Sequence, residues 1–149
     1  MNRLFGAGLL VGLLAVLGCG GSKDEGGLVP VAGNIKVDGE TAPNAVVKYI
    51  PQGNTGGHGG TGTTDSTGRY EITSPYGKKG LPPGQYKVTI SRRLNPDGSP
   101  PGPNEMPIES NARETLPVKY ADQEKTELKV DLSADDKRSF DFDLKVKKK

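Results

Sequence analysis

Alternation of apolar and polar side chains at every second position constrains the fold of this chain more than any other feature. Successive side chains of a strand point to opposite faces of a sheet, so this period predicts strands with one apolar and one polar face. Such runs recur from Val29 onward, and only Glu109–Leu116, bracketed by two prolines, has room for a short turn of helix. The predicted strands lie at residues 35–37, 46–50, 70–73, 86–91, 128–132 and 140–147. We therefore expect an all-β fold in which two antiparallel sheets pack face to face as a β-sandwich.

Glycine and proline are concentrated between these runs. The 22 glycines and 12 prolines are densest in two stretches, Gly53–Gly62 and Asn95–Asn104. This placement is typical of strands that are joined by long loops, and it differs from the even spread of a disordered low-complexity chain.

The N-terminus has the layout of a secretory signal. Arg3 supplies one positive charge, and the apolar run Leu4–Leu17 follows it. A charged start before a short apolar run is the pattern of an export signal. The run is too short to span a membrane comfortably, because a spanning helix needs about 20 apolar residues.

The sequence Val16-Leu17-Gly18-Cys19 resembles the lipobox of bacterial lipoproteins, although Leu17 departs from the small residue that is usual at its position. The resemblance implies signal cleavage between Gly18 and Cys19, and lipidation of the Cys19 thiol with a diacylglycerol whose acyl chains, such as palmitate, hold the protein in a membrane. Cys19 is the one cysteine of the chain, and a lone thiol in an exported protein otherwise needs an explanation. The alternative is an ordinary cleaved signal followed by an incidental cysteine.

Three units are therefore predicted along the chain. Residues 1–18 form the signal peptide, residues 19–28 the lipidated cysteine and a flexible tether, and residues 29–149 the folded domain. Eight polar and glycine residues of such a tether span roughly 16 Å on average. In two-membrane bacteria an aspartate after the cysteine often retains a lipoprotein at the inner membrane. This chain has Gly20 there, which favours the outer membrane. We thus expect an extracytoplasmic, lipid-anchored protein of the cell envelope.

A second resemblance concerns the folded domain. The segments Val31–Gly39 with Ala42–Val47, Thr64–Ile72, and Leu81–Ile90 occur in that order. They resemble the carboxypeptidase regulatory-like (transthyretin-like) domain. The resemblance implies a seven-stranded antiparallel β-sandwich, transthyretin-like or Ig-like, of the kind appended to many exported bacterial proteins, and it does not imply a peptidase. Within the second segment we expect a tight turn at Asp65–Gly68, because aspartate accepts bonds from the backbone two residues on and glycine adopts a positive φ.

Residues that carry catalysis or bind metals are scarce. His58 is the one histidine and lies in a glycine-rich stretch, and the chain has no Gly-x-Ser-x-Gly motif. The transthyretin-like fold includes a ureide hydrolase that depends on several histidines and ends in Tyr-Arg-Gly-Ser, whereas this chain ends in three lysines. Asp65, Asp97 and Asp135–Asp136 have the setting of turn residues and lack calcium-loop spacing. We therefore expect no enzyme, no cofactor and no metal site.

The formal net charge of +2 gives no reason to expect nucleic-acid binding. We expect a non-catalytic module for protein interaction or adhesion, with the membrane as one partner through the lipid on Cys19 and an envelope protein or glycan as the other. The predicted binding surface consists of two long loops, residues 53–62 and 94–107, at one end of the sandwich. Its candidate contact residues are Asn54, His58, Thr61, Asn95, Asp97 and Asn104. A purely structural envelope lipoprotein and a small-ligand or carbohydrate carrier remain as alternatives.

Overall fold

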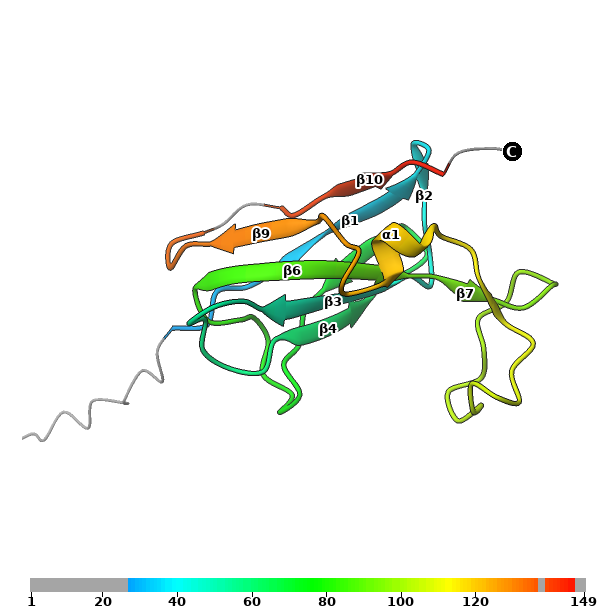
Figure 1. The fold of residues 1–149 in the computed structure, drawn as a ribbon, viewed down its shortest axis with the longest axis horizontal. Coiled ribbons are helices and arrows are strands. Elements are labelled where there is room, and N and C mark those ends of the chain that lie inside the picture. The colour runs from blue at the N-terminus through cyan, green and yellow to red at the C-terminus, as the bar shows by residue number, and fades with distance from the viewer. Residues whose placement is uncertain (1–26, 137–138, 147–149) are drawn as a thin grey trace, which may run out of the picture.

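A computed structural model describes residues 27–136 and 139–146 of the 149-residue chain (Figure 1). Gly18, Cys19 and most of the predicted tether lie outside the described residues. In chain order the strands are β1 (Ala32–Val37), β2 (Glu40–Thr41), β3 (Val46–Pro51), β4 (Gly60–Thr63), β5 (Arg69–Glu71), β6 (Gly84–Ser91), β7 (Arg93–Leu94), β8 (Arg113–Glu114), β9 (Lys129–Leu132) and β10 (Phe142–Leu144). The helix α1 (Val118–Ala121) lies between β8 and β9. The described part of the chain is therefore mostly β, as the alternation predicts, and it contains no helix long and apolar enough to span a membrane.

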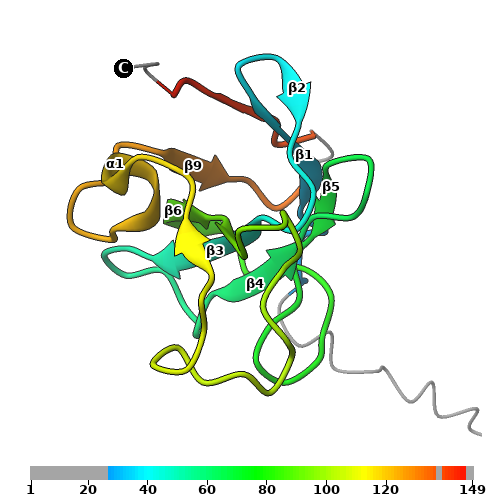
Figure 2. The ribbon, with the colours of Figure 1, turned by 90° about the vertical axis from the view of Figure 1, so that its right-hand side faces the viewer.

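Two four-stranded sheets make up the body of the molecule, and Figure 2 shows them from one end. The first sheet has the order β4-β3-β6-β9 and is antiparallel throughout. In the second sheet β1 pairs with β10, β2 and β5. A short antiparallel ribbon of β7 and β8 stands apart from both. All six predicted strands coincide with observed ones, because each buries one face of its alternation.

The pairing of β10 with β1 is parallel, with Phe142 opposite Ile35, so the expectation of antiparallel pairs alone is wrong. The chain leaves β9 in the first sheet and crosses to the second sheet before β10 begins. It reaches β1 near the start of that strand, where the Phe140 N–H donates to the Ala32 carbonyl oxygen at 2.9 Å. β10 therefore runs in the same direction as β1.

Gly33, within β1, makes this approach of the C-terminal segment possible. A Cβ atom at Gly33 would lie 2.0 Å from the carbonyl oxygen of Phe140. That oxygen belongs to backbone, which cannot swing aside as a flexible side chain can. A residue without a side chain is needed where two backbones come this close.

The core is built from the inward faces of both sheets. Its largest fully buried side chains are Tyr49, Tyr70, Tyr86, Ile35, Ile72, Leu81, Ile90, Leu132, Leu144, Val29, Val31 and Val47. The rings of Tyr49 and Tyr86 meet edge to face with centroids 6.0 Å apart. Full burial of one such side chain stabilises a fold by about 1.5 to 3 kcal/mol, so these positions account for much of the driving force.

Two of the buried tyrosines are joined through their hydroxyl groups. The Tyr70 hydroxyl donates to the Phe140 carbonyl oxygen at 2.7 Å, and 3.0 Å separates the hydroxyl oxygens of Tyr49 and Tyr70. Because Tyr70 has one proton and gives it to the carbonyl, Tyr49 is the donor in the second bond. Burial raises the pKa of both hydroxyls well above the ordinary value of a tyrosine. This hydrogen-bonded chain joins β3, β5 and the segment that leads into β10.

Four observed strands were not predicted from the sequence, namely the two-residue strands β2, β7 and β8 and the longer β4. β4 falls in the stretch 53–62 that was expected to be a loop, so that expectation is wrong from Gly60 onward. A Cβ atom at Gly60 would lie 2.6 Å from Ile72 Cγ2, and one at Gly62 would lie 2.4 Å from the Glu71 carbonyl oxygen. The glycines of β4 therefore allow close packing against the neighbouring chain, and they leave no apolar signature.

The short helix also lies elsewhere than expected. Residues 109–116 contain β8, whereas α1 begins just after Pro117, which occupies its N-cap position. Proline is tolerated at the start of a helix because the N–H that it lacks has no partner within the helix there. The predicted helical turn before Pro117 is thus wrong, and the proline marks the beginning of the helix.

We predict unequal effects for the two hydroxyls of the tyrosine pair. Tyr70→Phe removes two hydrogen bonds and should lower the free energy of unfolding by about 2 to 3 kcal/mol, whereas Tyr49→Phe removes one and should lower it by about 1 kcal/mol. Denaturant titration measures both values. Tyr76→Phe, at a ring that is 74% exposed, is the control and should change little. Equal losses at the two buried positions would contradict the assignment of two hydrogen bonds to Tyr70 and one to Tyr49.

The buried tyrosines should also make the free energy of unfolding depend on pH in the alkaline range. The folded-state pKa of both tyrosines is raised, so their neutral form contributes stability that is fully present below the unfolded-state pKa of about 10. That stability is lost as the pH rises above this value. Tyr49→Phe should therefore lose less stability than the wild type between neutral and strongly alkaline pH.

Candidate functional site

The two loops predicted to form one binding surface lie at opposite ends of the body (Figure 1). In the antiparallel pairing of β3 and β6, Val46 lies opposite Ser91 and Pro51 lies opposite Tyr86. The loop 52–59 follows Pro51, whereas the segment after Ser91 leaves from the other end. The expectation of a shared surface is therefore wrong, because two antiparallel neighbours send their next segments in opposite directions.

The loop 52–59 is fastened to the start of β6. The Thr55 hydroxyl accepts a bond from the Gln85 N–H at 2.8 Å and donates to the Gln85 carbonyl oxygen at 3.1 Å. Asn54 and His58 are exposed on this loop, and the His58 ring meets the Tyr76 ring edge to face at 5.6 Å. Thr61 is not a loop residue, because it lies on β4 opposite Lys48.

The segment from Arg93 to Glu114 projects from the other end of the body as a long loop, and its first and last residues pair as two short strands. There β7 and β8 pair with Arg93 opposite Glu114, and the Arg93 guanidinium donates to the Ala112 carbonyl oxygen at 2.8 Å. The neighbouring Arg92 donates from Nε to the Pro43 carbonyl oxygen at 3.0 Å. We call residues 93–114 the distal excursion.

The Glu114 carboxylate fastens the base of the distal excursion. Its Oε2 accepts from the Ser91 hydroxyl at 2.5 Å, and its Oε1 accepts from the N–H groups of Arg92 at 2.9 Å and Leu116 at 3.0 Å. Hydrogen bonds to a carboxylate are stronger than those between neutral groups. One side chain thus holds the outgoing and returning chain together.

The polar residues that we expected to contact a partner are used within the excursion itself. Asn95 and Ser99 form a tight turn, with the Asn95 N–H donating to the Ser99 carbonyl oxygen at 2.8 Å. Asp97 accepts from the Ser99 hydroxyl at 2.6 Å and the Ser99 N–H at 2.9 Å, and these bonds lower the pKa of its carboxyl. Asn104 is exposed in a second turn. Asn95 and Asp97 therefore shape the loop.

Two large apolar side chains are exposed on the part of the distal excursion whose side chains are not used in these turns. Ile108 is 91% exposed and Met106 is 59% exposed. Glu105 and Glu109 flank this pair in sequence, and both are exposed. The only signal in the sequence is a pair of apolar residues in a proline-rich stretch. Such a pair does not indicate a binding surface by itself, and its exposure becomes clear only with the turns that surround it in the structure.

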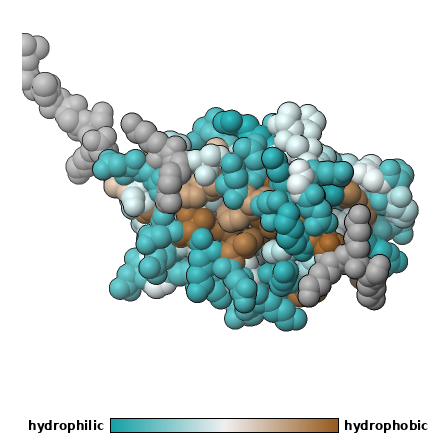
Figure 3. Space-filling view, turned by 90° about the horizontal axis from the view of Figure 1, so that it is seen from above, coloured by the Kyte–Doolittle hydropathy of each residue, from teal (hydrophilic) through white to brown (hydrophobic). Residues whose placement is uncertain are grey.

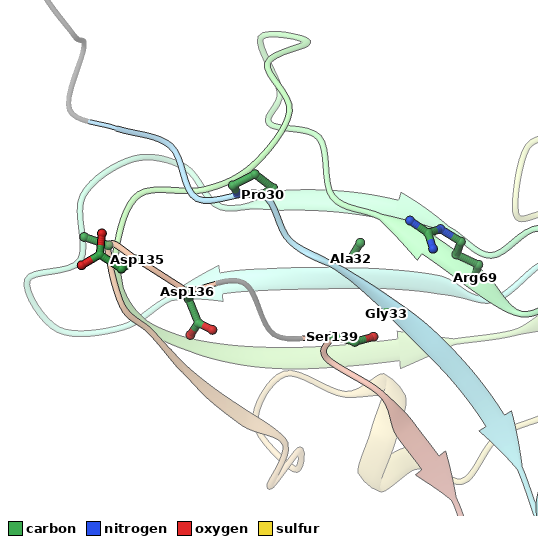
Figure 4. Close-up of a pocket in the computed structure, with 8 residues that line it drawn as sticks. Pro30, Ala32, Gly33, Arg69, Asp135, Asp136 and Ser139 are labelled. Carbon is green, nitrogen blue, oxygen red and sulfur yellow. The ribbon is translucent and has the colours of Figure 1, made fainter.

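Two hollows in the body are weaker candidates. The first has a volume of about 500 Å³, with a floor of Ala32 and Gly33. Figure 4 places Asp135 and Asp136 at one end of it and Arg69 at the other, so opposite charges do not converge. Positions 137 and 138 lie outside the described residues.

The second hollow lies along the seam between β9 and β10, where apolar surface is visible among hydrophilic side chains from above (Figure 3). It has a volume of about 300 Å³, and Val130, Phe140 and Phe142 line its apolar part. Near the end of β10 the Tyr120 hydroxyl accepts from the Lys145 N–H at 3.1 Å and donates to the Lys145 carbonyl oxygen at 3.3 Å. α1 therefore covers part of this edge.

The acids that were considered as metal ligands are also held in turns. Asp65 accepts from the Thr67 N–H at 2.8 Å, the Thr67 hydroxyl at 2.6 Å and the Arg69 N–H at 3.1 Å, and these bonds lower the pKa of its carboxyl. Gly68 has a φ of +81°, so the predicted tight turn at Asp65–Gly68 is confirmed. Within residues 27–136 and 139–146, no three His, Cys, Asp or Glu side chains are grouped to hold a metal ion.

Comparison of the chain with family models, with curated proteins and with solved structures found no match.

We predict that Glu114→Ala loosens the distal excursion without unfolding the body. Loss of the carboxylate removes three hydrogen bonds at the base, so trypsin should cleave after Arg93 and Arg113 faster than in the wild type. Limited proteolysis followed by mass spectrometry measures this rate. Glu109→Ala is the matched control, because its side chain makes none of these bonds. Equal cleavage rates in both variants would show that Glu114 does not hold the base.

Proposed function

We propose that this protein is a non-catalytic, lipid-anchored module of the cell envelope that binds another protein through its distal excursion. The described chain begins at one end of the body, and the excursion stands at the other (Figure 1). An anchor before residue 27 would hold the first end near a membrane and would leave the excursion facing away from it. β6 alone, with eight residues at about 3.3 Å each, separates the two ends by roughly 26 Å.

The exposed apolar tip of the excursion is the observation that carries the proposal. Met106 and Ile108 lie in a segment whose base is fastened by Glu114 and by the β7–β8 ladder. A partner that covers such side chains loses little entropy in ordering them, because the loop is already shaped by its own turns. Large apolar side chains that a partner removes from water are frequent sources of binding energy.

A protein fits this surface better than a glycan does. Residues 93–114 include no phenylalanine, tyrosine, tryptophan or histidine, so they offer no ring on which a sugar could stack. The acidic residues Glu105 and Glu109 beside the tip favour a partner with basic groups around an apolar recess.

The domain itself is proposed to be a seven-stranded sandwich of the carboxypeptidase regulatory-like kind. In support, the turn at Asp65 occurs within one of the segments that carry the resemblance. A second such segment contains a bend at Pro82–Gly84, where the Tyr86 hydroxyl donates to the Pro82 carbonyl oxygen at 2.7 Å. Both contacts shape the turns between strands of the domain.

The proposed anchor predicts a specific intact mass. Protein purified from membranes should have the mass of residues 19–149 with acyl chains on Cys19. Cys19→Ser should lose the acyl mass and leave the membrane fraction. An unmodified mass for the wild-type chain, cleaved or uncleaved, would contradict the anchor and the outer-membrane location proposed with it.

The proposed binding surface is tested by site-specific photo-crosslinking in the native cell. A photoreactive amino acid at position 108 should give a discrete adduct with another protein, and Met106→Ser should weaken that adduct. Position 118 is the control, because Val118 is 55% exposed but lies on α1. If position 108 gives no adduct beyond those of position 118, the excursion binds no protein, and a purely structural role or a small-ligand carrier becomes the better account.

A further inference from the structure

The hairpin between β5 and β6 has an exposed aromatic tip. Thr73 and Lys79 form its bridge, and the Ser74 N–H donates to the Lys78 carbonyl oxygen at 2.8 Å. Gly77 has a φ of +76°, which allows the tight turn. Tyr76 lies at the tip, and it is the one exposed tyrosine or phenylalanine in the part of the chain that the structure describes.

This hairpin lies beside the point at which the N-terminal chain enters the fold. Val29 and Leu81 exchange backbone hydrogen bonds of 2.8 and 2.9 Å, and Leu81 comes two residues after the hairpin bridge. A Cβ atom at Gly80 would lie 2.5 Å from the Val29 carbonyl oxygen, so the two segments are in close contact. The tip and the chain entrance therefore belong to the same end of the body.

We infer that the tip of this hairpin, with Tyr76 and the neighbouring His58, contacts the lipid surface to which the protein is anchored. The inference rests on the proposed anchor at Cys19. Nine positions separate Cys19 from Leu28, and the tether predicted there from the sequence would reach about 17 Å on average and at most about 31 Å. The end of the body with Tyr76 is thus held within a few tens of ångströms of the membrane.

The chemistry of the tip suits the headgroup region of a bilayer. Tyrosine combines an apolar ring with a polar hydroxyl, and such rings are enriched at membrane–water interfaces. The His58 ring packs edge to face against Tyr76, with ring centroids 5.6 Å apart, and adds a second exposed ring beside the tip. Lys79 is paired with Glu71 at 3.2 Å, so the contact depends mainly on the rings and only secondarily on anionic lipid.

Tethering makes a weak contact of this kind effective. One exposed tyrosine has little affinity for a bilayer when the protein diffuses freely. A short tether turns the contact into an intramolecular one, which raises its effective concentration greatly. The hairpin then orients the body, so that the distal excursion points away from the lipid surface.

Tryptophan fluorescence tests this orientation, because the chain contains no tryptophan. Tyr76→Trp and Ile108→Trp each introduce one reporter, at opposite ends of the body. Each variant is expressed as the full lipidated protein and reconstituted into phosphatidylcholine vesicles with a minor fraction of phosphatidylglycerol. Lipids brominated near the top of their acyl chains should quench the fluorescence at position 76 and shift the emission of the remaining signal to shorter wavelength. They should leave position 108 unchanged.

The outcomes separate the inference from the proposed function on which it rests. Acylated protein with quenching at position 76 and none at position 108 supports the inference. Acylated protein with equal or no quenching at the two positions overturns the inference and leaves the anchor intact. Absence of acyl mass overturns the anchor and the inference together. Circular dichroism and the denaturation midpoint check that both variants are folded, which is expected because both positions are exposed.

Discussion

The close backbone approach of Phe140 to Gly33 is the constraint on which the rest of the structure depends. It allows β10 to pair in parallel with β1, and it brings the Phe140 carbonyl oxygen within reach of the Tyr70 hydroxyl. Through Tyr49 the same hydrogen-bonded chain reaches the other sheet. One carbonyl group from the C-terminal part of the chain thus joins both sheets in the core, where an unsatisfied polar group would be expensive.

The directions of the paired strands determine which segments lie at each end of the body. β3 and β6 run antiparallel through the centre of one sheet, so the segment after β3 and the segment after β6 cannot share a surface. The chain entrance, the hairpin with Tyr76 and the loop with His58 lie together at one end, and the distal excursion projects from the other end (Figure 1). With the proposed N-terminal anchor, this arrangement would place one end near the membrane and leave the other end free for the proposed partner.

The strand positions were predictable from the sequence where side chains carry the packing. Tyr86, Val88 and Ile90 alternate with polar residues, and all three are buried. β4 was not predicted because its close contacts are made by the backbone of Gly60 and Gly62. Glycine has no side chain, so it adds nothing to an alternation of apolar and polar residues. The parallel pairing of β10 escaped for a different reason. It joins residues more than a hundred positions apart, and alternation specifies which face of a strand is buried but leaves its neighbour and direction open.

Two of the candidate contact residues, Asn95 and Asp97, are used in turns of their own loop, for a physical reason that applies to many glycine- and proline-rich loops. A loop without a ladder of its own must satisfy its backbone locally, so its short polar side chains are taken up by turns, as Asp97 is by Ser99. Large apolar side chains far from the base of such a loop stay exposed, because so few residues do not form a core of their own. Met106 and Ile108 thus remain in water until another surface covers them. In an ordered excursion of this kind, the apolar residues therefore indicate the binding surface better than the polar ones.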